Sequence, residues 1–150
     1  MSQPPSLEDR ATYHHGNLRD ALIGAGLELT RIGGRDALVL RDVTRRVGVS
    51  PNAAYRHFGD LEALRAAVAA RVQEGATDRM RALMTDAATG RGLLRAVGLG
   101  YIAFAMAEPG WFDVAFGDAH ARPDDQGALP APLTALVAAL DALVADGDLA

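Results

Sequence analysis

Apolar side chains recur every three or four residues along most of the chain, the spacing that places them on one face of an α-helix. The first such stretch predicts a helix from the capping residue Asn17 to about Ile32, with Gly33-Gly34 as its stop. Its expected core stripe is Leu18, Leu22, Ala25, Leu29 and Ile32. Gly24 and Gly26 weaken a helix, so they mark either close packing or sequence drift.

Residues 41–58 predict two short helices joined by a tight turn. Val43 and Val47 lie four apart and form the apolar face of the first helix, and Gly48 supplies the left-handed cap that ends it. Ser50 followed by Pro51 is a typical helix start, because the serine side chain can accept free amide hydrogens and proline has none to satisfy. Ala54 and Phe58 should then face the core, on a helix of nine residues that begins at Ser50.

The other side chains of this second helix should face outward. An exposed Asn52 and Arg56, four residues apart, can pair with adenine and guanine from one helix face. Tyr55 and His57 can donate to phosphate oxygens, and Arg41 and Arg45 can add a base or backbone contact and a phosphate clamp. For any single arginine a solvated helix face is the plainer interpretation, but the coincidence of turn, charge and outward side chains favours nucleic acid. The candidate contact residues are Arg41, Thr44, Arg45, Ser50, Asn52, Ala53, Tyr55, Arg56 and His57.

The later helices form a second unit. The pattern predicts a long helix capped by Asp60 and extending to about Met84, then helices over residues 92–107 and 133–144, with a short helical patch over 111–116 and a polar loop over 117–130. The stripe of the long helix is Leu61, Leu64, Val68 and Val72. Pro109-Gly110 should close the helix over residues 92–107, and Asp146-Gly147-Asp148 should end the last one.

Composition narrows the class of protein. The chain has 150 residues, 49% of them hydrophobic and 23% charged, and no cysteine. β-branched alternation is absent, so the fold class should be all-α. No signal peptide or membrane span is expected, and the lack of cysteine fits a cytoplasmic protein. There is no Gly-x-Ser-x-Gly turn, phosphate-binding glycine loop or histidine pair with a carboxylate at metal spacing, so we expect neither an enzyme nor a metal or cofactor site.

Charge is unevenly distributed along the chain. Residues 10–60 hold eight arginines and five acids, a balance of +3, whereas residues 61–150 hold seven arginines and twelve acids, a balance of −5. Glu8 and Asp9 complete the net charge of −4. Phosphate attraction acts over about a Debye length, so a basic head on an acidic body is compatible with nucleic-acid binding.

The sequence Gly-Val-Ser-Pro-x-x-x-Tyr-x-His-Phe at residues 48–58, with an amphipathic helix before it and an Asp-x-Glu-x-Leu helix start after it, resembles the N-terminal domain of TetR family transcriptional repressors. The opening Tyr13-His14-His15-Gly16-Asn17-Leu18-Arg19 is similar to a subgroup whose ligand domain is named for a Trp-His-Gly motif. The resemblance implies an arm over residues 1–12, a helix-turn-helix DNA-binding head over 13–60 and a helical regulatory domain over 61–150. It also implies a homodimer on a palindromic operator in double-stranded DNA, and a small-molecule effector that releases the repressor.

The chain departs from the family pattern at several positions. Leu61 stands where lysine is common and Val39 where threonine or serine is common, so two phosphate contacts are lost, whereas Thr44 replaces a usual alanine and can bond either backbone or DNA. Family members commonly carry two more helices after residue 150, which form the dimer interface, so we expect an incomplete regulatory domain. A protein-interaction module that has lost specific DNA binding is therefore the alternative function. The candidate effector pocket, for which ordinary core packing is the competing interpretation, is Met80, Met84, Tyr101, Phe104, Met106, Trp111, Phe112 and Phe116.

Overall fold

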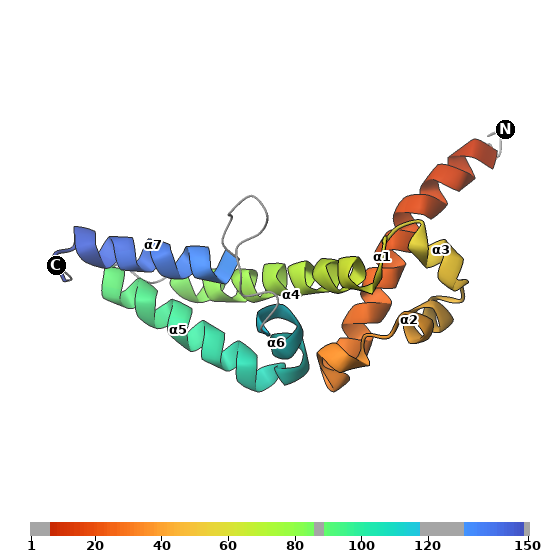
Figure 1. Ribbon diagram of the computed structural model, residues 1–150. Coiled ribbons are helices and arrows are strands. Elements are labelled where there is room, and N and C mark those ends of the chain that lie inside the picture. The colour runs from red at the N-terminus through yellow and green to blue at the C-terminus, as the bar shows by residue number, and fades with distance from the viewer. Residues whose placement is uncertain (1–6, 86–88, 118–130, 149–150) are drawn as a thin grey trace.

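The computed structural model describes residues 7–85, 89–117 and 131–148, and within these ranges all regular secondary structure is helical (Figure 1). This confirms the all-α fold class. In chain order the elements are α1 (Leu7–Gly33), η1 (Arg35–Ala37), α2 (Leu40–Val47), α3 (Pro51–Tyr55), α4 (Leu61–Met84), α5 (Gly90–Ala107), α6 (Pro109–Phe116) and α7 (Ala131–Ala145). The polar loop expected over residues 117–130 lies almost wholly outside the described residues.

The helices form a small head and an elongated body that share α4. In Figure 1, α2 and α3 lie beside α1 at one end of the molecule, while α5 and α7 flank the far part of α4. The first half of α4 contributes Leu64 and Val68 to the head core, where they pack with Leu22 of α1 and Val43 of α2. The same helix contacts α5, α6 and α7 further along. The helix α4 is therefore a continuous structural connection between head and body.

Helix α1 differs from the prediction in its first residue and in the residues that form its buried face. It begins at Leu7, so the predicted cap at Asn17 is wrong, and residues 7–12 of the expected arm are helical. Residues 7–16 contain no proline that would stop the helix. Ile32 is 93% exposed and is not a core residue. The buried side of α1 contains Leu22, Gly26 and Thr30, which are spaced four residues apart. Ile32 follows Thr30 by two residues, and because each residue of an α-helix turns by about 100°, it points about 200° away from that side.

Close helix packing explains one of the two early glycines. A Cβ on Gly26 would lie 2.7 Å from Cγ2 of Val68, whereas a Cβ on Gly24 would meet no atom within 4 Å. Gly26 therefore lets α1 and α4 approach closely. The predicted stop is also confirmed, because α1 ends at Gly33 and Gly34 follows with a left-handed φ of 64°.

The body helices follow their predicted bounds closely. Asp60 caps α4 by accepting the N–H of Ala63 at 2.7 Å, and Thr89 caps α5 by accepting the N–H of Gly92 at 3.1 Å. Pro109-Gly110 does more than close α5, because Pro109 is the first residue of α6. Val114 of α6 belongs to the head core, which places this short helix between head and body.

Candidate functional site

The turn between α2 and α3 has the geometry that its sequence predicts. Gly48 adopts a left-handed conformation with φ of 78°, and its N–H donates to the carbonyl oxygens of Thr44 and Arg45. Ser50 then caps α3, since its hydroxyl oxygen accepts the N–H of Ala53 at 3.3 Å. The two helices are thus joined by only three residues, and their relative orientation is fixed by hydrogen bonds at both helix ends.

The helix α3 is shorter than predicted. It runs from Pro51 to Tyr55, and Arg56 and His57 lie in the turn that follows rather than in a helix reaching Phe58. The N–H groups of His57 and Phe58 both bond to the carbonyl of Ala54, which tightens this last turn. The predicted nine-residue helix from Ser50 to Phe58 is therefore too long, because α3 ends at Tyr55.

The outward face of α3 is nevertheless the one that the sequence predicts. Ala54 is fully buried and Phe58 is 4% exposed, and both belong to the head core. Asn52 and Arg56 are exposed, and Tyr55 is 52% exposed. Ala53, which offers a methyl group, is half-buried on the same element, as is His57 in the following turn. A short rod with a hydrophobic base and a polar outer side is thus presented to solvent.

The arginines around this rod differ in whether they form ion pairs with acidic side chains. Arg45 of α2 pairs with Asp42 at 2.7 Å, and Arg46 pairs with Glu28 of α1 at 2.7 Å. Arg41 and Arg56 are exposed and form no ion pair with any described residue. Their positive charge can meet an anionic partner without breaking an ion pair to a described residue, which favours them over Arg45 as candidate ligands of phosphate or guanine.

Thr44 does not belong to the candidate contact surface. Its side chain is 2% exposed, and its hydroxyl donates to the carbonyl oxygen of Arg41 at 3.1 Å. The sequence allowed the Thr44 hydroxyl to bond either the backbone or DNA, and it bonds the backbone. The hydroxyl is therefore satisfied inside α2 and is not exposed on the outer face.

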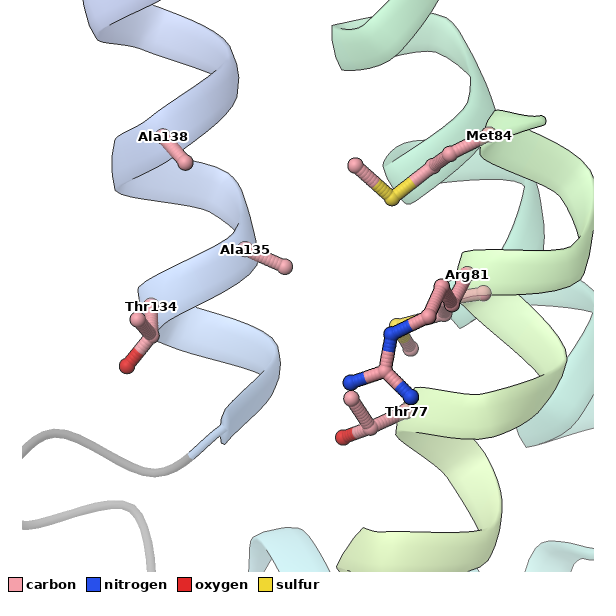
Figure 2. Close-up of a pocket in the computed structure, with 7 residues that line it drawn as sticks. Thr77, Arg81, Met84, Thr134, Ala135 and Ala138 are labelled. Atoms are coloured by element: carbon pink, nitrogen blue, oxygen red, sulfur yellow. The ribbon is translucent and has the colours of Figure 1, made fainter. Parts of the chain in front are cut away.

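The eight residues predicted to line an effector pocket do not share one cavity. Met80 and Met84 line a pocket of about 410 Å³ between α4 and α7, together with Thr77, Arg81, Thr134, Ala135 and Ala138. Figure 2 shows Arg81 and Met84 extending from α4 toward α7, which presents Ala135 and Ala138 to them. Phe104 and Trp111 line a separate cavity of about 160 Å³.

The other four predicted pocket residues do not line either cavity. Tyr101, Phe112 and Phe116 pack edge to face or tilted, with ring centroids 5.1 to 5.2 Å apart. Phe112 and Phe116 pack against the buried cluster that contains Phe104, which is the competing interpretation of their sequence pattern, whereas Tyr101 is 37% exposed and is not a core residue. Met106 is 80% exposed and is not a pocket residue. The helical spacing placed these side chains on α5 and α6 correctly, but it did not indicate which of them face a void.

Sequence reasoning missed the contacts that join α1 to α6. Arg31, near the end of α1, forms two hydrogen bonds of 2.7 and 2.8 Å with the carboxylate of Glu108, which immediately precedes α6 and is 6% exposed. Trp111 donates its indole N–H to the carbonyl of Leu27 at 2.8 Å, and its ring lies under the Arg31 guanidinium. The pairing with Arg31 holds the pKa of Glu108 below its usual value and raises the pKa of Arg31.

This pairing predicts a pH-dependent contribution to stability. A carboxyl group whose pKa is lowered by folding stabilises the native state above its unfolded pKa of about 4.3, and the contribution disappears as pH falls through the lowered folded value. We expect Glu108→Gln to reduce the free energy of unfolding at pH 7, with a difference from wild type that shrinks at acidic pH. Urea unfolding at several pH values measures it. Asp78→Asn, in an exposed pair with Arg81, is the matched control, and an equally small effect of both variants would contradict the prediction.

Together, the three-helix head, its capped turn and the exposed polar side of α3 define a helix-turn-helix DNA-binding protein. Family comparisons agree. Residues 22–68 match the model of bacterial regulatory proteins of the tetR family, and residues 94–150 match a tetracyclin repressor-like C-terminal domain. The chain belongs to the TetR family, and it is a DNA-binding transcriptional regulator.

A solved structure of a protein with unknown function from Rhodococcus sp. RHA1 has the same arrangement, with a TM-score of 0.64 and 29% sequence identity. The match covers 92% of this chain and 73% of that chain. No curated protein matches the sequence. Members of the TetR family are generally not enzymes, and no group of three or more histidine and acidic side chains among the described residues could hold a metal ion. The helices of the described residues include no candidate membrane span.

Proposed function

We propose that this regulator is a repressor that binds a palindromic operator as a homodimer and leaves it when a small-molecule effector binds the body. The observation that carries the proposal is the exposed face of α3, where Asn52 and Arg56 project on the side opposite buried Ala54. An asparagine amide can pair with adenine and a guanidinium with guanine in the major groove. Arg41, exposed and without an acidic partner among the described residues, supports the same contact from α2.

A homodimer is proposed because one such helix makes too few contacts on its own. Helix-turn-helix proteins reach specific affinity by placing two recognition helices in successive major grooves, roughly 34 Å apart. A palindromic operator follows from the two-fold symmetry of the dimer. The overall affinity for DNA should be lowered by two lost phosphate contacts, since the side chains of Val39 and Leu61 are apolar and cannot bond phosphate.

Effector release is proposed from the path of α4. Its N-terminal half packs in the head core through Leu64 and Val68, and its later residues line both cavities of the body. An effector that displaces the body end of α4 would therefore reorient the head. It releases DNA only if it binds the DNA-incompetent arrangement better, because equal affinity for both arrangements shifts no equilibrium.

The direct test is a gel-shift titration of the full chain against DNA that flanks its own gene, at two salt concentrations and with random DNA as competitor. The proposal predicts a sequence-selective complex whose affinity falls as salt concentration rises. A plot of the logarithm of the binding constant against the logarithm of salt concentration falls by roughly 0.9 for each phosphate contacted, and the slope here should be shallower than that of a protein making about 6–10 such contacts. A complex that forms equally on random DNA, or none at low salt, would contradict the proposal.

Two substitutions on α3 and its following turn should separate specificity from general affinity. We expect Arg56→Ala to reduce discrimination at one or two base pairs by about 1–3 kcal/mol. Tyr55→Phe removes a phosphate donor and should weaken binding to all sequences alike. Competition titrations with operator variants measure both. If Arg56→Ala weakened specific and random DNA equally, the guanidinium would be a phosphate ligand and not a base contact.

A protein-interaction module remains the second candidate, and two observations favour it. Val39 at the start of α2 is 45% exposed, and Leu61 at the start of α4 packs partly against the head core, so neither anchors the head to phosphate. A chain that gave no salt-sensitive, sequence-selective shift but formed a defined complex with another protein would fit this function.

A further inference from the structure

A second cavity lies where the head meets the body. It has a volume of about 160 Å³, and its apolar walls come from four helices, with Leu27 of α1, Val72 of α4, Phe104 of α5 and Trp111 of α6. An engineered protein cavity of about 150 Å³ with similar aliphatic and aromatic walls stays dry and binds benzene. The cavity therefore has the size and lining for one aromatic ring.

Three residues of α4 form the polar edge of this cavity. Arg71, Gly75 and Arg79 follow one another at four-residue spacing, which places them on one face of the helix. Gly75 has no side chain between the two arginines, and a Cβ at this position would meet no atom within 4 Å. A glycine in a helix interior is unfavourable by roughly 1 kcal/mol relative to alanine, and here it leaves a notch between two cations.

One of these cations, Arg79, has no ion-pair partner among the described residues, although its charge acts on Glu108 from a distance and helps to lower the pKa of that carboxyl group. The guanidinium of Arg79 lies 5.8 Å from the centroid of the Phe104 ring and forms no ion pair with any described residue. Arg71 makes only long, exposed pairs, at 3.4 Å with Glu74 and 3.8 Å with Asp20. Glu108, the acid on which Arg79 acts, is itself engaged by two hydrogen bonds from Arg31.

We propose that this cavity binds a small aromatic carboxylate, with the ring between Phe104, Trp111 and Val72 and the carboxylate on Arg79. The geometry combines a ring-sized apolar space with a guanidinium at its edge that forms no ion pair with a described residue, which is the complement of a benzoate-like anion. The pocket between α4 and α7 offers no such combination, because its arginine, Arg81, is paired with Asp78 at 2.7 Å.

The site also has a place in regulation. Leu27 belongs to the DNA-binding head, and its carbonyl accepts the indole N–H of Trp111, so a ligand in this cavity touches head and body together. The inference thereby deepens the proposed function by naming the chemical class of effector. Only this regulatory consequence rests on the proposed function, because binding of the carboxylate itself requires no DNA.

The test uses Trp111, the single tryptophan of the chain, as a fluorescent reporter. Benzoate titrated into the full chain should change the emission saturably. Benzyl alcohol has the ring without the charge, and acetate has the charge without the ring. Each should bind at least about tenfold more weakly than benzoate. Absence of a saturable change, or equal binding of benzoate and acetate, would overturn the proposal.

Paired variants locate the site. Arg79→Gln should weaken benzoate about tenfold, whereas Arg81→Gln in the other pocket should leave the affinity unchanged. Gly75→Leu should fill the notch and abolish the response, while Gly98→Leu, at a helical glycine that also has open space around it, should not. Unchanged benzoate affinity in both Arg79→Gln and Gly75→Leu would overturn the assignment. A chain that binds benzoate but ignores DNA would contradict the proposed function alone.

Discussion

Phe58→Ala is expected to destabilise the chain by about 3–5 kcal/mol, the range for removing a buried phenylalanine ring, and to abolish DNA binding at the same time. Phe58 lies beyond the end of α3, is 4% exposed and packs in the head core. The guanidinium of Arg19 covers its ring at 5.2 Å. Because α3 has only five helical residues, its orientation depends on the buried side chains of Ala54 and Phe58 more than on the stability of the helix itself.

Ile32→Ala is the matched control for this variant. It also removes a large apolar side chain from the head, but Ile32 is 93% exposed, so the expected change in unfolding free energy is within about 0.5 kcal/mol. Urea unfolding followed by circular dichroism measures both. Comparable losses for the two variants would mean that α1 buries Ile32 in solution and that its stripe is assigned wrongly.

Gly110→Ala is expected to lower stability by about 3 kcal/mol, at the upper end of the usual overpacking range. A Cβ on Gly110 would lie 2.3 Å from the carbonyl oxygen of Arg31 and 2.4 Å from that of Thr30. Both atoms are backbone at the end of α1, so they cannot rotate away as a side chain would. The substitution should push α6 off α1 and disturb the contact between Arg31 and Glu108.

Gly98→Ala provides the comparison, because a Cβ there meets no atom within 4 Å. Alanine is the better helix former, so this variant should gain about 0.5–1 kcal/mol. Thermal and urea unfolding of the two variants should therefore diverge in opposite directions from wild type. A Gly110→Ala protein as stable as Gly98→Ala would show that α6 does not pack closely against the end of α1.

Local signals in the sequence predicted the head well. Gly48, Ser50 with Pro51, and Asp60 each determine a helix end through a single residue's backbone preference or side-chain hydrogen bond, and all three act as predicted. Ala54 and Phe58 were identified as buried because a short amphipathic segment leaves little choice of inward face. The exposure of Asn52 and Arg56 then follows, although their contact with DNA is still a prediction.

What the sequence could not provide is information about distant contacts. Arg31 and Glu108 are 77 residues apart, and no periodic pattern connects them. The sequence does not decide whether Thr44 bonds the backbone or DNA, because helical spacing does not reveal how deeply each residue of α2 is buried. The cavity residues were misassigned for a related reason: periodicity places Tyr101 and Phe112 on apolar faces, but only the packing of α4, α5 and α6 decides which faces enclose a void. The length of α1 was underestimated because its first turns lack an apolar stripe.

The most direct test of the central claim is to map the amide chemical shifts of the full chain as it binds a DNA duplex selected from a random pool. The exposed face of α3 should enter the major groove, so the largest changes should fall on residues 50–57 and on Arg41, and Arg56→Ala should remove the preference for the selected duplex. Unperturbed amides over residues 50–57, with changes confined to another surface of the chain, would contradict the account.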